Sequence, residues 1–206
     1  MGELRRASEV RQVELVDAAL QIIATRGIAA LTTRSLAAEV GLSSGAIFRH
    51  FASLDALLEA VVGRVESVLD STYPPIELPP RERLERFVEA RSAAVGSQLG
   101  ILRLVVSEQF LLALPAHSSA RLSACIQKTR AFVLGCVREG QAAGAIRTDL
   151  DASALAVVVL GTTQLLALAP WAPRRRPAEA RAVRGALLAL LAPPAARRPK
   201  RRKRST

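Results

Sequence analysis

Two short polar runs between residues 31 and 51 carry the side chains best suited to bind another molecule. Hydroxyl and imidazole groups donate hydrogen bonds to phosphate oxygens, and a guanidinium group can also bond guanine O6 and N7. Such a set is typical of a surface that contacts double-stranded DNA. The candidate DNA-binding residues are Thr32, Thr33, Arg34, Ser43, Ser44, Gly45, Phe48, Arg49 and His50.

Two short helices must position these side chains. A threonine hydroxyl can cap the first helix, and Gly41 can end it because glycine tolerates the left-handed conformation. A serine can cap the second helix, in which Ile47 and Phe51 lie four residues apart and share an inward face. A preceding helix that stops at Gly27 completes the unit. The spacing therefore predicts a helix-turn-helix, whose second helix enters the DNA major groove.

From Val10 to Val62 the chain resembles the TetR (tetracycline repressor) family of bacterial transcriptional regulators. The resemblance rests on a helix that ends in glycine, then on the segments LTTRSLA, GLSSG and IFRHF, and on a helix that opens at Ser53. It implies that Thr33 and His50 bind phosphates and that Arg34 reaches a base edge. It also implies that the Ser44–Gly45 end of the second helix enters the groove.

Two residues depart from the family pattern, and three of the candidates have a second interpretation. Phe48 stands where many relatives carry Tyr, and Leu54 where they carry Lys, so one hydroxyl and one cation are absent. From the sequence, Thr33 could also be only a helix cap, Arg34 a solvated charge, and His50 a surface histidine without a partner. These alternatives stay open at this point.

The net charge of +11 is not evidence for the helix-turn-helix. Residues 1–173 hold 17 basic and 17 acidic side chains, whereas residues 174–206 hold 12 basic and one acidic. The excess therefore lies at the C-terminal end, where the cluster RRPKRRKR predicts a disordered tail. This tail could hold DNA phosphates without sequence preference, or it could simply be solvated.

The composition favours helices and argues against an enzyme. Half of the 206 residues are apolar but only 3% are aromatic, which suits packed helices better than sheets. The two cysteines lack metal-ligand spacing, and no Gly-rich phosphate loop or nucleophile elbow is present. We therefore expect no cofactor, no metal and no catalytic site. Without a visible signal peptide, we expect a cytoplasmic protein.

The remaining chain predicts helices that form a ligand pocket. A long amphipathic helix opens at Ser53, a proline-rich loop occupies residues 72–80, and helices follow over 81–97, 101–114 and 118–143. Apolar walls with few polar groups suit a site for a small apolar or amphipathic effector. The candidate ligand-binding residues are Phe87, Arg91, Leu102, Val105, Glu108, Phe110, Thr129, Phe132 and Gln164.

Residues 152–173 carry no charge over 22 positions, which is long enough to cross a membrane. However, Thr162, Thr163 and Gln164 interrupt the run at its middle. A helix that is apolar all round is also expected where it is buried between its own core and a second subunit. With residues 178–191 it makes the pair that forms an intersubunit four-helix bundle in the TetR family. We expect this bundle and no membrane contact.

Together these observations predict an all-α homodimer. An N-terminal three-helix helix-turn-helix domain would cover residues 1–52, a C-terminal ligand-binding and dimerisation domain residues 53–192, and the basic tail residues 193–206. The predicted function is that of a sequence-specific transcriptional regulator, a repressor that an effector releases from a palindromic operator. The alternatives are a membrane-anchored protein and a protein that coats DNA without sensing a ligand.

Overall fold

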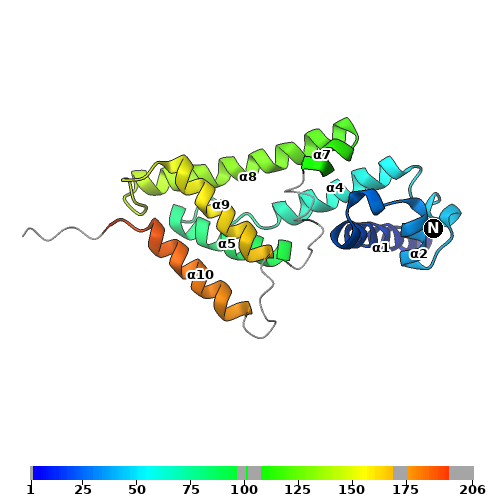
Figure 1. Cartoon of the computed structure of the whole chain (residues 1–206), viewed down its shortest axis with the longest axis horizontal. Coiled ribbons are helices and arrows are strands. Elements are labelled where there is room, and N and C mark those ends of the chain that lie inside the picture. The colour runs from blue at the N-terminus through cyan, green and yellow to red at the C-terminus, as the bar shows by residue number, and fades with distance from the viewer. Residues whose placement is uncertain (1, 97–100, 102–107, 169–175, 195–206) are drawn as a thin grey trace, which may run out of the picture.

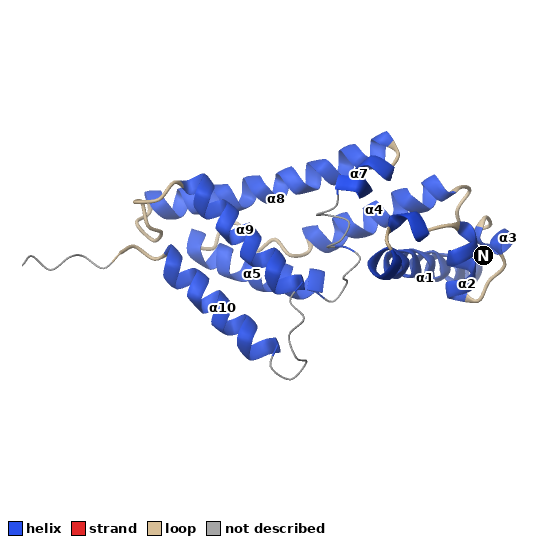
Figure 2. Ribbon diagram, viewed as in Figure 1, coloured by secondary structure: helices blue, strands red, loops and turns tan. Residues whose placement is uncertain are grey.

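The computed structural model describes the chain except for residues 1, 97–100, 102–107, 169–175 and 195–206. Within the described residues every regular element is a helix, which confirms the predicted all-α class (Figure 2). The helices form an elongated molecule, with α2 near one end and α10 near the other (Figure 1). The elements are α1 (Gly2–Arg26), η1 (Ile28–Ala30), α2 (Thr33–Val40), α3 (Ser44–Ile47), α4 (Leu54–Asp70), α5 (Pro80–Gly96), α7 (Glu108–Ala113), α8 (Ala116–Ala142), α9 (Ala152–Leu168) and α10 (Arg176–Leu191).

The ends of α2 and α3 are set by side-chain caps and a left-handed glycine. The Thr32 hydroxyl accepts a hydrogen bond from the backbone N–H of Ser35 at 3.0 Å, and the backbone N–H of Thr32 donates to Ser35 Oγ at 2.9 Å. Gly41 ends α2 with a φ of 67°. The Ser43 hydroxyl then accepts from the backbone N–H of Ala46 at 3.2 Å. The predicted hydroxyl caps and the stop at Gly41 are confirmed, and the structure selects Thr32 over Thr33 and Ser43 over Ser44 as the capping residues.

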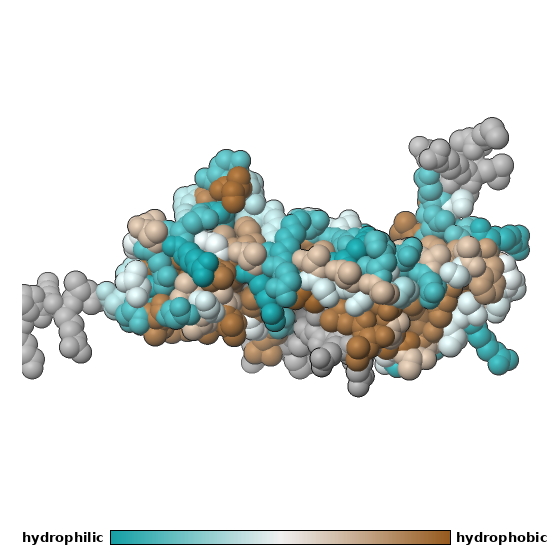
Figure 3. All heavy atoms as spheres, turned by 90° about the horizontal axis from the view of Figure 1, so that it is seen from above, coloured by the Kyte–Doolittle hydropathy of each residue, from teal (hydrophilic) through white to brown (hydrophobic). Residues whose placement is uncertain are grey.

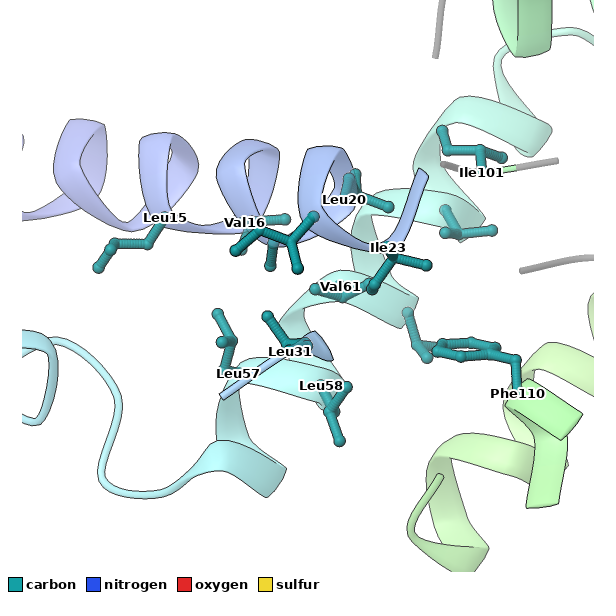
Figure 4. Close-up of a cluster of buried hydrophobic side chains, with 14 of the residues drawn as sticks. Leu15, Val16, Leu20, Ile23, Leu31, Leu57, Leu58, Val61, Ile101 and Phe110 are labelled. Atoms are coloured by element: carbon teal, nitrogen blue, oxygen red, sulfur yellow. The ribbon is translucent and has the colours of Figure 1, made fainter. Parts of the chain in front are cut away.

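A buried apolar cluster joins the N-terminal helices to α4. Side chains of α1 face those of α4 across this cluster, and Phe110 of α7 approaches it from the other side (Figure 4). The side chains labelled there are Leu15, Val16, Leu20, Ile23, Leu31, Leu57, Leu58, Val61, Ile101 and Phe110. Because α4 supplies much of this core, the cluster continues across the predicted domain limit between residues 52 and 53. That limit stays a prediction.

A second buried cluster holds α5, α8, α9 and α10 together. Phe87 of α5, Val137 of α8 and Val159 of α9 are all fully buried in it. Leu187 and Leu191 attach α10 to the same core. The two clusters place the N-terminal helices at one end of the molecule and the helix pair α9 and α10 toward the other (Figure 1).

Two predicted helix limits were wrong. Helix α8 begins at Ala116, directly after Pro115, instead of at Ser118 or Ser119. Ser118 cannot act as the cap because its side chain is completely buried within the helix, where its hydroxyl has no described partner. The regular part of α3 also ends at Ile47, and turns continue as far as Phe51.

The apolar run from residue 152 forms a shorter helix than its lack of charge suggested. Helix α9 ends at Leu168, and residues 169–173 lie outside the described part of the chain. No described helix combines the length with the apolar character that a bilayer crossing requires.

Candidate nucleic-acid interface

The proposed DNA-contacting residues lie at one end of the molecule, where α2 and α3 are found (Figure 2). Of the nine, Thr33 and His50 are half-buried, and the other seven are exposed. Specific recognition requires side chains that can reach base edges and phosphates without first unfolding their support. The structure therefore brings the predicted set together on accessible backbone.

Segment 43–51 has one buried and one exposed side. Ile47 is 2% exposed and Phe51 is 8% exposed, and both belong to the first buried cluster. Phe48 lies between them in sequence but is 50% exposed. The backbone N–H of Phe51 still donates to the carbonyl of Ile47 at 3.0 Å, so the turn after α3 keeps these two residues on one side. This confirms the predicted seating of the segment.

The N-terminus of α2 presents backbone donors that the helix itself does not use. The first bond of the helical ladder runs from the N–H of Leu36 to the carbonyl of Thr32 at 2.9 Å. The N–H groups of Thr33 and Arg34 precede this bond and point out of the helix end. Together with the positive end of the helix dipole they are suited to a phosphate oxygen.

His50 is held by α1, which the sequence did not predict. The Gln12 side-chain amide donates to the His50 carbonyl at 3.0 Å, and the Ser8 hydroxyl lies 3.4 Å from His50 Nδ1. These contacts span about forty positions of sequence, so no local pattern could reveal them. They leave Nε2 as the imidazole nitrogen that can meet a phosphate.

An ion pair ties α2 to the helix beneath it. The Arg26 guanidinium, in the last turn of α1, donates to the Glu39 carboxylate at 2.8 Å. Both side chains are exposed, so the pair adds little stability by itself. It links the last turn of α1 to the helix that carries Arg34.

Part of the predicted ligand set also comes together, in the second half of the chain. The rings of Phe87 and Phe132 lie 5.2 Å apart, and Tyr73 stacks on Phe87 at 6.0 Å and meets Phe132 edge-on at 5.0 Å. The Arg91 guanidinium carbon lies 4.9 Å from the centre of the Phe87 ring. The Thr129 hydroxyl lies 2.9 Å from the Tyr73 hydroxyl. We call these five residues the Arg91 cluster.

Tyr73 was not predicted from the sequence, and two predicted residues, Phe110 and Gln164, lie in other surroundings. Tyr73 belongs to the loop after α4, where no periodicity indicates which side chain turns inward. Phe110 is buried, but it packs in the first cluster with α1 and α4. Gln164 is exposed on the outward side of α9. The assignment of both to one pocket with the Arg91 cluster stays a prediction.

The three other predicted ligand residues cannot be placed in this way. Leu102 and Val105 lie outside the described residues. Glu108 is the first residue of α7, and the structure describes its backbone but not its side chain. Their assignment remains a prediction.

Arg91 is a buried cation with neutral partners. Its side chain is 7% exposed, and burial lowers the pKa of the guanidinium from its usual value, an effect that the neighbouring Tyr73 side chain opposes. Nε donates to the Thr72 hydroxyl at 2.7 Å and Nη2 donates to the Leu69 carbonyl at 3.0 Å. The Leu69 carbonyl belongs to the last turn of α4, where a helix dipole favours a cation.

Comparison with known proteins decides the family. Residues 15–61 match the family model described as bacterial regulatory proteins, tetR family. This segment is therefore a TetR-family DNA-binding domain. The protein is a DNA-binding transcriptional regulator, and the matched segment contains all nine candidate DNA contacts.

Curated relatives and solved structures agree with this family. The chain is 27% identical over 152 residues to the HTH-type transcriptional repressor KstR2 of Rhodococcus jostii, covering 68% of this chain and 70% of the relative. It is 26% identical over 162 residues to KstR2 of Mycolicibacterium smegmatis, covering 74% and 76%.

The fold is shared with solved structures at lower identity. The structure of the ketosteroid transcriptional regulator KstR2 of Mycobacterium tuberculosis superposes with a TM-score of 0.77 at 22% identity, covering 88% of this chain and 95% of that one. The structure of AibR in complex with isovaleryl coenzyme A and operator DNA gives a TM-score of 0.73 at 17% identity, covering 89% and 99%.

Proposed function

We propose that this TetR-family regulator represses transcription by binding a two-fold symmetric operator as a homodimer, and that a small apolar or amphipathic effector releases it. Thr33, His50 and the N-terminus of α2 bind phosphates, Arg34 and Arg49 lie along the groove, and the Ser44–Gly45 end of α3 enters it. The protein would act in the cytoplasm, where a bacterial operator lies. We assign it no catalytic step.

The exposed side of segment 43–51 is the observation that carries this proposal. Its apolar residues are buried against α1 and α4, while its hydroxyl, aromatic and cationic groups remain accessible beside the free N-terminus of α2. One helix-turn-helix contacts only a few base pairs, so two copies related by symmetry would be needed for useful specificity.

The outward side of α9 supports a homodimer. Val157, Val158 and Leu165 are exposed although they are large and apolar, and Gly161 between them is exposed as well. Their spacing keeps them on one face of the helix, opposite the buried face that contains Val159. This largely apolar face, which also carries the exposed Gln164, is typical of an interface.

Helix α10 offers small residues next to this face. Ala182, Gly185, Ala186 and Ala189 are all exposed, and nothing lies within 4 Å of the position where a Cβ would stand on Gly185. Small side chains allow another helix to approach closely. The pair α9 and α10 therefore suits a four-helix bundle with a second copy of the chain.

The Arg91 cluster supports an effector site. It combines three aromatic rings with a cation and two hydroxyl groups in the half of the chain that α4 connects to the helix-turn-helix. The AibR structure, which shares the fold, holds both isovaleryl coenzyme A and operator DNA. A small-molecule effector is therefore proposed for this chain too.

Selection of bound sequences from a random DNA pool tests the DNA-binding part of this proposal. A palindromic consensus with half-sites about one helical turn apart, or a larger whole number of turns, is the expected result. Footprinting on genomic fragments should then give discrete protection at matching sites. Broad protection without a consensus would favour the DNA-coating alternative and would contradict a specific operator.

A further inference from the structure

We propose that the Arg91 cluster binds an organic anion with an apolar body, and that Arg91 receives its carboxylate or phosphate group. Binding itself is independent of the DNA site, whereas the coupling to operator release described below rests on the proposed function.

The guanidinium of Arg91 has donors to spare. An arginine has five N–H donors, and Arg91 makes three hydrogen bonds within the described structure. The third of these, from Nη1 to the Thr129 hydroxyl, is 3.5 Å long and therefore weak. All three acceptors are neutral oxygens. A planar fork with free donors matches a carboxylate or phosphate group, which could take two parallel bonds.

No described carboxylate forms an ion pair with this cation, and Asp70 acts on it only through space. Asp70, which follows Leu69 in α4, is paired with Lys128 at 2.7 Å on the exposed side of Tyr73. A buried charge without a partner of opposite sign is costly. The rings of Tyr73 and Phe87, with centres 5.2 Å and 4.9 Å from the guanidinium carbon, offset part of this cost but bring no negative charge. An incoming anion would supply it.

The surroundings of Arg91 suit the rest of such a ligand. Phe87 and Phe132 provide apolar walls, and Tyr73 is half-buried between Arg91 inside and Lys128 outside, whose Nζ lies 5.0 Å from the Tyr73 ring. Tyr73 lies in the loop between α4 and α5, whereas the four other residues of the Arg91 cluster lie in α5 and α8. Rotation of this ring would open a path past Lys128, which would attract an anion to the entrance.

The site is connected to the DNA-binding end through α4. Arg91 holds the Leu69 carbonyl and the Thr72 hydroxyl, at the point where α4 ends. An anion bound to the free donors would draw the guanidinium toward itself and weaken its bonds to both acceptors, so the C-terminal end of α4 would lose part of its anchor on α5. Because the other end of α4 packs on α1, its displacement would move the helix-turn-helix.

Binding can be measured on the full-length protein without DNA. Straight-chain alkyl carboxylates, alkyl phosphates and primary amides of equal length serve as probes, with calorimetry and thermal unfolding as readouts. The anions should bind and raise the melting temperature, and the amides should bind roughly tenfold to a hundredfold more weakly, the difference expected for charged over neutral hydrogen bonds. Comparison of the first two probes identifies the preferred head group.

Variants of one helix provide the control. Arg91→Gln should remove the preference for anions, whereas Arg86→Gln, on the exposed face of the same helix, should keep it. Arg91→Lys retains the charge without the fork and should bind the anions with intermediate strength. If amides bind wild-type protein as well as the anions do, or if no anion binds, the proposal is wrong, whether or not the variants fold.

A separate titration of the DNA complex tests the coupling. The anion that binds should release a selected operator from the wild type, and the Arg91→Gln protein should retain the DNA at the same anion concentration. Anion binding without release would overturn the coupling through α4 while leaving the ligand assignment intact. Failure to find any operator would count against the proposed function and not against the anion site.

Discussion

Single side chains in the helix-turn-helix serve both the fold and the proposed contact with DNA. The Ser43 hydroxyl accepts from the backbone N–H of Ala46, and its own hydrogen remains available to a phosphate oxygen. Thr32 has less freedom, because its hydroxyl accepts from the backbone N–H of Ser35 and donates to Ser35 Oγ at 3.1 Å. The same polar residue type thus contributes differently at the two helix starts.

The two roles of Ser43 can be separated by substitution. Ser43→Ala removes the cap and should lower the free energy of unfolding by about 1 kcal/mol, as measured by urea denaturation. Ser43→Asp keeps a capping oxygen, so stability should be retained, but its negative charge would repel phosphates and weaken operator binding. Equal operator affinity for Ser43→Asp and wild type would exclude Ser43 from the DNA interface.

Arg49 should act mainly through its charge. Arg49→Ala should weaken binding to all DNA sequences alike and reduce the salt slope by about 0.9 units if one phosphate contact is lost. Fluorescence anisotropy at several salt concentrations measures this slope. Arg86→Ala removes an exposed arginine from α5 and should leave the slope unchanged. A change in base preference for Arg49→Ala would instead indicate a base contact.

At the scale of elements, α8 is constrained by the turn that follows it. The backbone carbonyl of Gly140 accepts from the N–H groups of Ala145 at 2.8 Å and Ile146 at 3.0 Å. This return brings the Ile146 side chain against the helix, where a Cβ on Gly140 would lie 2.5 Å from Ile146 Cδ1 and 2.7 Å from Cγ1. The absence of a side chain at Gly140 therefore permits the close packing.

A glycine pair in this helix tests the packing. Gly140→Ala should lower the free energy of unfolding by roughly 1–3 kcal/mol because Ile146 must move. Gly135→Ala, where the nearest atom is a flexible carboxylate oxygen at 3.9 Å, should instead raise stability by roughly 0.5–1 kcal/mol through helix propensity. Urea unfolding of both variants gives the comparison. Equal effects of the two substitutions would contradict the close approach.

At the scale of the whole molecule, apolar residues remain exposed along α9 and α10. Apolar atoms also reach the surface in several other places, as a view from above shows (Figure 3). What distinguishes α9 is the helical spacing of Val157, Gly161 and Leu165 on a face opposite the core. This order is expected of a subunit interface and not of scattered surface residues.

A charge on this face should separate the subunits. Leu165 is 65% exposed, and Leu165→Glu should weaken dimerisation at least about tenfold, because a carboxylate buried without a partner is costly. Light scattering coupled to size exclusion measures the mass, and operator binding should fall with it. Ile76→Glu changes an equally exposed residue in the loop after α4 and should remain dimeric. A monomeric wild type would overturn the proposed interface.

The sequence by itself determined the local structure of this protein and the family of its DNA-binding segment. Helix periodicity, capping hydroxyls and the left-handed Gly41 depend on neighbours a few positions away, so Thr32, Ser43 and the seating of Ile47 and Phe51 could be predicted. The same spacing carried the resemblance to TetR-family regulators, because a helix-turn-helix is built from contiguous residues.

Only the tertiary structure decided which distant side chains meet. Tyr73 lies in a loop without periodicity, yet it completes the aromatic cluster beside Arg91, while Phe110 faces a different core. Gln12 reaches the His50 carbonyl across the helix-turn-helix. Such contacts depend on how whole helices cross, and the position of a residue along its own helix does not contain that information.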